Sequence, residues 1–97
     1  MSQNNVINAY HTQGVAQNVA YTGTAGAITN GVSEGVNIVE VTVTTAAYVV
    51  ENGVATTANG RYCVANLPYL FKVRKGDKPS AIQATTGGSM FVSELTH

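Results

Sequence analysis

The residues of this chain that could do chemistry are gathered in one short stretch, YLFKVRKGDKPSAI, which covers residues 69–82. Ten of the 97 residues carry a charge, and five of the ten lie in this stretch, namely Lys72, Arg74, Lys75, Asp77 and Lys78. Such a cluster can attract an acidic surface and orient a partner against it. The chemistry that the stretch indicates is therefore electrostatic recognition.

Catalytic and cofactor-binding patterns are missing from the sequence. The two histidines, His11 and His97, lie near opposite ends, and neither has a neighbour at metal-ligand spacing. No histidine lies in the middle of the chain to activate a serine, and Asp77 is the only aspartate. The Gly-rich segment TGTAGAITNG lacks the Lys-Ser/Thr ending of a phosphate-binding loop. We therefore expect a protein that is not an enzyme and that uses no metal or cofactor.

The elements that must position the charged stretch are expected to be strands. The chain is rich in Val, Thr, Tyr, Gly and Asn, which favour strands and turns. About seven short strands alternate with turn residues, a pattern typical of a small antiparallel β-sandwich or barrel, either jelly-roll-like or immunoglobulin-like. The expected strands cover residues 16–21, 36–44, 46–51, 61–65, 69–74, 80–84 and 89–95. Residues 1–14 are expected to form an extended N-terminal arm, residues 22–35 a long loop, and residues 15–97 a single domain.

Alternation within the expected strands predicts the core. Tyr69, Phe71 and Val73 should point inward, whereas Leu70, Lys72 and Arg74 should point outward. Gly76 and Asp77 suit a two-residue hairpin loop after this strand, and Asn59-Gly60 suits a type I′ turn. The expected core consists of Val39, Val41, Val43, Val64, Phe71, Val73, Ile82, Phe91 and Val92.

The candidate interface is this basic hairpin together with two residues of the arm. It comprises Lys72, Arg74, Lys75, Asp77, Lys78, Tyr10 and His11. Charges on an outer strand face are often only solvated, with Lys protecting a sheet edge, and that interpretation stays open. The scarcity of charge elsewhere favours binding, either to an acidic partner or to the Glu34, Glu40 and Glu51 side of another copy.

Composition limits the remaining possibilities. The formal net charge is zero, so no overall field draws the chain to nucleic acid or to a membrane. Cys63 is the single cysteine, which excludes an internal disulfide and favours a buried, unreactive thiol. Residues 1–10 resemble no secretory signal, and no stretch approaches the length of a membrane span. We expect a chain made in the cytoplasm that gains stability by associating.

The sequence as a whole resembles a group of short all-β structural proteins of tailed bacteriophages. The resemblance is carried by HTQGVAQNVAYTGTAG, by VNIVEVTVTTAAYVV and by YLFKVRKGDKPSAIQATTGGSMFVSEL. It covers nearly the whole chain, and residues 51–68 match it least. Its motifs consist of strand and turn signals and not of chemical groups.

The resemblance implies a role in the virion, most simply as a head decoration (cement) protein. Such a protein would bind the major capsid protein on the capsid exterior, as a homo-oligomer with a trimer favoured, and would bridge neighbouring capsomers. The alternative is a head or tail fibre or connector component. A fibre module could bind a glycan through Tyr48, Tyr62 or Tyr69.

Overall fold

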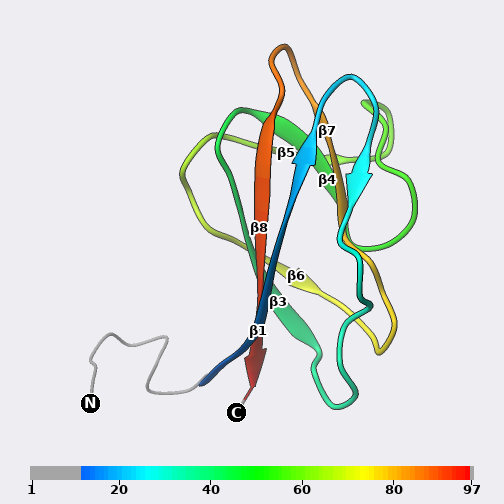
Figure 1. The fold of residues 1–97 in the computed structure, drawn as a ribbon, viewed down its shortest axis with the longest axis vertical. Coiled ribbons are helices and arrows are strands. Elements are labelled where there is room, and N and C mark those ends of the chain that lie inside the picture. The colour runs from blue at the N-terminus through cyan, green and yellow to red at the C-terminus, as the bar shows by residue number, and fades with distance from the viewer. Residues whose placement is uncertain (1–11, 97) are drawn as a thin grey trace.

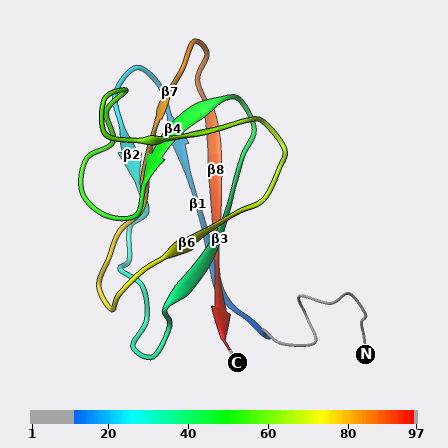
Figure 2. The same ribbon diagram turned by 180° about the vertical axis from the view of Figure 1, so that it is seen from behind.

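A computed structural model describes residues 12–96, which form eight strands and no helix. The strands pair into two antiparallel four-stranded sheets, in the orders β1-β8-β3-β6 and β2-β7-β4-β5. The bounds are β1 Thr12–Tyr21, β2 Gly26–Ala27, β3 Ile38–Val43, β4 Ala47–Val50, β5 Arg61–Cys63, β6 Tyr69–Lys72, β7 Ser80–Gln83 and β8 Gly88–Thr96. In Figure 1 β1 and β8 lie in front, whereas the reverse view in Figure 2 brings β4 forward. The expected small antiparallel β-sandwich is confirmed.

The strands pair from the two ends of the chain inward, the first with the last. β1 pairs with β8, β2 with β7, β3 with β6 and β4 with β5, as in a long two-stranded ribbon folded at the connection 51–60. Wrapping this ribbon so that alternate pairs fall in different layers produces the connectivity of a jelly roll. The consequence for the site is that β5 and β6, although consecutive in the chain, belong to different sheets.

The alternating valines of β3 anchor the core. Val39, Val41 and Val43 are fully buried, whereas the residues between them are only half-buried. This is the alternation expected of a sheet with one face against a core. The buried cluster also includes Phe71, Val73 and Val92, as the sequence predicts.

Three other expected core residues are not buried in this way. Phe91 is 47 % exposed, because Met90 and Val92 take the inward positions of β8. Val64 follows the end of β5 and is 36 % exposed, and Ile82 is only half-buried. The prediction is therefore wrong for Phe91 and Val64.

Two turn predictions are also wrong. The turn after β6 spans residues 74–77, with Asp77 N donating to Arg74 O at 3.0 Å and Gly76 at a φ of 85°. It does not close a hairpin, because β6 and β7 lie in different sheets. At Asn59-Gly60 neither residue has a positive φ, so no type I′ turn forms there. The Asn59 side chain instead accepts a hydrogen bond from Thr56 N at 2.8 Å.

The N-terminal part is more regular than expected. The first strand begins at Thr12, within the segment predicted as an arm, and its register against β8 shifts between Gln13 and Ala16. Residues 1–11 of the arm lie outside the described residues. The expected loop 22–35 contains the short β2, and it buries Ile28 and Val32 in the core.

Candidate functional site

The basic cluster begins at the end of β6 and continues through the turn 74–77. The Asp77 carboxylate accepts a hydrogen bond from Arg74 N at 2.9 Å, in addition to the main-chain bond that closes the turn. The positive φ of Gly76 suits a residue without a side chain. Asp77 therefore shapes the turn that carries the cations.

The connection before β3 holds this turn in place. Val32 N donates to Asp77 O at 2.9 Å, and Gly76 N donates to Val32 O at 2.8 Å. Lys75 also lies 3.9 Å from a carboxylate oxygen of Glu34, but both side chains are well exposed. An ion pair of this kind contributes about 0–1 kcal/mol, so the main-chain bonds fix the turn.

A buried carboxylate anchors that connection in turn. Glu94 is only 4 % exposed, and its Oε2 accepts hydrogen bonds from Ser33 N and Ser33 Oγ, both at 3.0 Å. Sequence reasoning gave Glu94 no role. Glu94 follows Met90 and Val92 at alternate positions of the strand, and this spacing could have indicated that it points inward. Glu94 on β8 thus holds Ser33, and the connection that contains Ser33 holds the basic turn.

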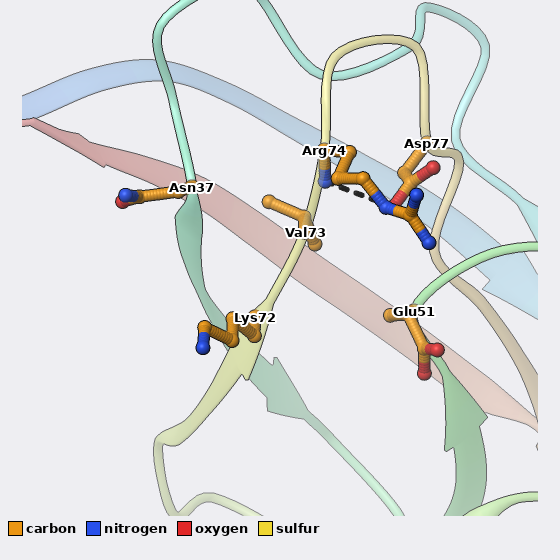
Figure 3. Close-up of a pocket in the computed structure, with 6 residues that line it drawn as sticks. All are labelled: Asn37, Glu51, Lys72, Val73, Arg74 and Asp77. Atoms are coloured by element: carbon orange, nitrogen blue, oxygen red, sulfur yellow. Dashed lines mark hydrogen bonds between the residues drawn. The ribbon is translucent and has the colours of Figure 1, made fainter.

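The side chains of the cluster do not all point the same way. Figure 3 shows Lys72 directed to the same side of the chain as Asn37, whereas Arg74 is directed to the opposite side, where Asp77 and Glu51 lie. The strand ends at Lys72, so the alternation expected to continue to Arg74 stops there. Between them lies an open hollow of about 430 Å³, lined by Asn37, Glu51, Lys72, Val73, Arg74 and Asp77.

The cations of the 72–78 cluster, of which Lys72 and Arg74 line this hollow, are exposed. Within residues 12–96, Lys75 makes the one side-chain ion pair found, and Lys72, Arg74 and Lys78 make none. Lys78 is held through its main chain, with its N–H donating to Asn52 Oδ1 at 2.9 Å. The five charged residues between 72 and 78 thus lie at the end of β6 and in or just after the turn that follows it, with Lys72 and Arg74 directed to different sides of the chain. The other two predicted residues, Tyr10 and His11, lie outside the described part of the chain.

Arg61 adds a sixth charge that the sequence did not associate with the site. It comes from β5, and its guanidinium carbon lies 5.1 Å from the ring centres of both Tyr69 and Phe71. Its Nη1 donates to the main-chain oxygen of Leu70 at 3.2 Å. Because this contact depends on the neighbouring positions of β5 and β6, only the three-dimensional fold reveals it.

Exposed apolar side chains lie in the segment that leads to the cluster. Tyr62, Leu67 and Leu70 are each about half exposed, and Val64 is exposed to a lesser degree. Tyr62 also packs edge-on against Tyr48, with ring centres 5.4 Å apart. Aromatic residues and arginine are enriched at protein interfaces, and Tyr62 and Arg74 are exposed here.

Cys63 lies beneath this surface and takes no part in it. The side chain is fully buried, and burial raises the pKa of its thiol, with a smaller opposing effect from Arg61. A thiol with a raised pKa is a poor nucleophile at neutral pH. The expectation of a buried cysteine is confirmed.

Among the described residues, no group of three or more His, Cys, Asp or Glu side chains is placed to hold a metal ion. No helix suited to crossing a membrane occurs in the same part of the chain. Comparison with protein-family models, curated proteins and solved structures finds no match.

Proposed function

We propose that this chain is a non-enzymatic structural protein of a tailed phage, which attaches to the exterior of the assembled capsid and stabilises it. The observation that carries the proposal is the cluster at 72–78, where exposed cations lie on and beside a firmly hydrogen-bonded turn, and where Lys72, Arg74 and Lys78 make no ion pair within residues 12–96. The sequence resemblance to phage virion proteins supports it. Jelly rolls are common in viral capsid domains, which supports it by analogy alone.

Attachment of this kind requires complementary charge and repeated contacts. Each exposed ion pair contributes about 0–1 kcal/mol, so the basic cluster sets orientation and encounter rate more than affinity. A symmetric oligomer, with a trimer favoured, would engage several equivalent capsid sites together. Contacts that are weak singly would then hold through avidity. Bridging between capsomers follows from the same geometry.

The first test measures binding of the purified protein to heads that lack it. We expect saturation at a stoichiometry fixed by the lattice, a higher temperature of head rupture, and weak binding to isolated capsid subunits. Reversing Lys72 and Arg74 to Glu should slow attachment and make it less sensitive to salt. A matched control adds Glu at Thr24 and Thr85, two exposed residues outside the cluster. If neither salt nor the two charge reversals changes attachment, the cluster is only a solvated strand face and not a binding site.

The second test locates the protein in the intact virion by cryo-electron microscopy. Density over the capsid exterior, in hundreds of copies, is the expected result. Density restricted to the portal or tail, with a bare capsid, would contradict the proposal and favour the fibre or connector alternative.

A further inference from the structure

The outer edge of β6 carries main-chain groups that no other strand uses. β6 is the last strand of its sheet, with β3 on one side only. Val73 N donates to Asn37 O at 3.0 Å, so Val73, and with it Phe71, turns its main chain toward the β3 side. Main-chain direction alternates along an antiparallel strand, so Leu70 and Lys72 turn theirs outward.

Arg61 shows that this edge can accept a donor from outside the sheet. Its Nη1 donates to Leu70 O at 3.2 Å, as a main-chain N–H group of an added strand would do. At Lys72, by contrast, neither the outward N–H nor the outward C=O has a hydrogen-bond partner among residues 12–96. One residue of an antiparallel segment could satisfy both groups of Lys72.

The side chains around this edge determine what kind of segment would fit. Leu70 is 47 % exposed and offers an apolar contact. An open hollow adjoins the strand on the side of Arg61 and is lined by Val49, Glu51, Asn59, Arg61, Leu70, Phe71 and Lys72. Lys72 and Arg74 supply positive charge without ion pairs in the described residues.

Features that protect the edge also select the partner. The strand has only four residues and carries Lys72, and Pro68 precedes it. Short edges, lysine and proline discourage indiscriminate pairing. A basic strand would place like charges beside Lys72, which is destabilising, whereas an acidic strand would place opposite charges there. Proteins commonly gain specificity by making the binding of a wrong partner unfavourable.

From these observations we propose that the edge of β6 binds an extended acidic segment of a partner protein, which adds to the β1-β8-β3-β6 sheet as a fifth strand. Strand addition of this kind takes affinity from main-chain hydrogen bonds and selectivity from flanking side chains. The proposal deepens the proposed function and depends on it for the source of the segment, an exposed acidic stretch of the capsid shell. Strand addition itself can be tested without capsids.

The test uses isotope-labelled full-length protein and a capped peptide, Thr-Glu-Val-Glu-Val-Glu-Thr, followed by NMR. We expect the amide signals of Leu70 and Lys72 to shift, and the Lys72 amide to gain protection from hydrogen exchange. A peptide with Lys in place of each Glu should bind at least tenfold more weakly. A peptide with N-methyl groups along its pairing edge should give no protection. Equal binding of the acidic and N-methylated peptides would overturn strand addition.

Two substitutions at one position separate charge from main-chain pairing. Lys72→Gln removes the charge and keeps the outward N–H, whereas Lys72→Pro removes both, at an edge position that tolerates proline. We expect Lys72→Pro to weaken peptide binding at least fivefold more than Lys72→Gln does. Equal loss would mean that charge alone acts. If Lys72→Pro perturbs the signals of β3, the N-methylated peptide decides the question.

Head-binding assays with the same variants distinguish this inference from the proposed function. Peptide binding at β6 without attachment to heads would contradict the capsid role and leave the strand-binding edge in place. Attachment to heads that is unchanged by Lys72→Pro, with no peptide binding, would leave the capsid role in place and overturn strand addition.

Discussion

The two phenylalanines of this chain provide a matched test of the fold. Phe71 is 8 % exposed and belongs to the core cluster, whereas Phe91 is 47 % exposed on the outer face of β8. Replacing a buried Phe with Ala generally costs about 3–5 kcal/mol of unfolding free energy. We expect about 3 kcal/mol for Phe71→Ala, because the ring lies at the rim of the core beneath Arg61. Phe91→Ala should cost about 1 kcal/mol or less.

These values predict a clear difference in thermal unfolding. For a domain of this size each kcal/mol shifts the melting temperature by about 4–8 °C. Phe71→Ala should therefore lower it by about 12–24 °C, and Phe91→Ala by about 8 °C at most. Calorimetry at several protein concentrations is the suitable assay, because dissociation of an oligomer would make the melting temperature depend on concentration. Equal shifts for the two variants, independent of concentration, would show that the inward and outward faces are wrongly assigned.

Three further predictions concern contacts that hold the sandwich together. Tyr21→Phe should lower the unfolding free energy by about 1–3 kcal/mol in urea denaturation, because the hydroxyl donates to Thr45 O at 2.6 Å and accepts from Thr45 N at 3.2 Å. Tyr48→Phe is the control, and an equal effect would contradict the role of that hydroxyl. Gly26→Ala should cost about 1–3 kcal/mol of unfolding free energy, because its Cβ would overlap the Ala20 carbonyl oxygen. Gly23→Ala is the control and should be tolerated, because the nearest atom to its Cβ lies at 3.8 Å. Similar melting temperatures for the two variants would refute this prediction. Because burial raises the pKa of Cys63 in the folded state, the unfolded state loses the thiol proton first, so stability should decline as pH rises above the usual thiol pKa. Urea denaturation at pH 8 and pH 10 should show a smaller decline for Cys63→Ala, and an identical decline would exclude Cys63 as the cause.

Local patterns in the sequence predicted much of the fold and less of its connections. The valines of β3 alternate with polar residues, so their inward face was unambiguous. In β8, by contrast, Met90, Phe91 and Val92 are all apolar, and alternation alone could not say which of them points outward. The turn at Gly76 was also visible in the sequence. That the chain there passes from one sheet to the other depends on pairings between distant strands.

The candidate site divides in the same way. The cations between Lys72 and Lys78 are neighbours in the sequence, so their clustering was predictable. Arg61 joins them only because β5 and β6 meet at one side of the sandwich. Glu94 meets Ser33 across 61 residues of sequence, and no local rule anticipates that pair.

The ribbon topology explains why the candidate edge lies at β6 and not at the opposite side of the sandwich. β1 and β2 form the edges of that opposite side, and they approach closely where Gly26 faces Ala20. The Gln17 side chain also donates to Asn30 O at 2.9 Å and accepts from Asn30 N at 3.1 Å, which closes that side. At the β5 and β6 side, the Arg61 side chain donates to Leu70 O, and the main-chain N–H of Val64, just after β5, donates to the Tyr69 hydroxyl. An added strand at β1 would therefore meet β2 and the contact between Gln17 and Asn30, whereas at β6 it would displace at most one arginine.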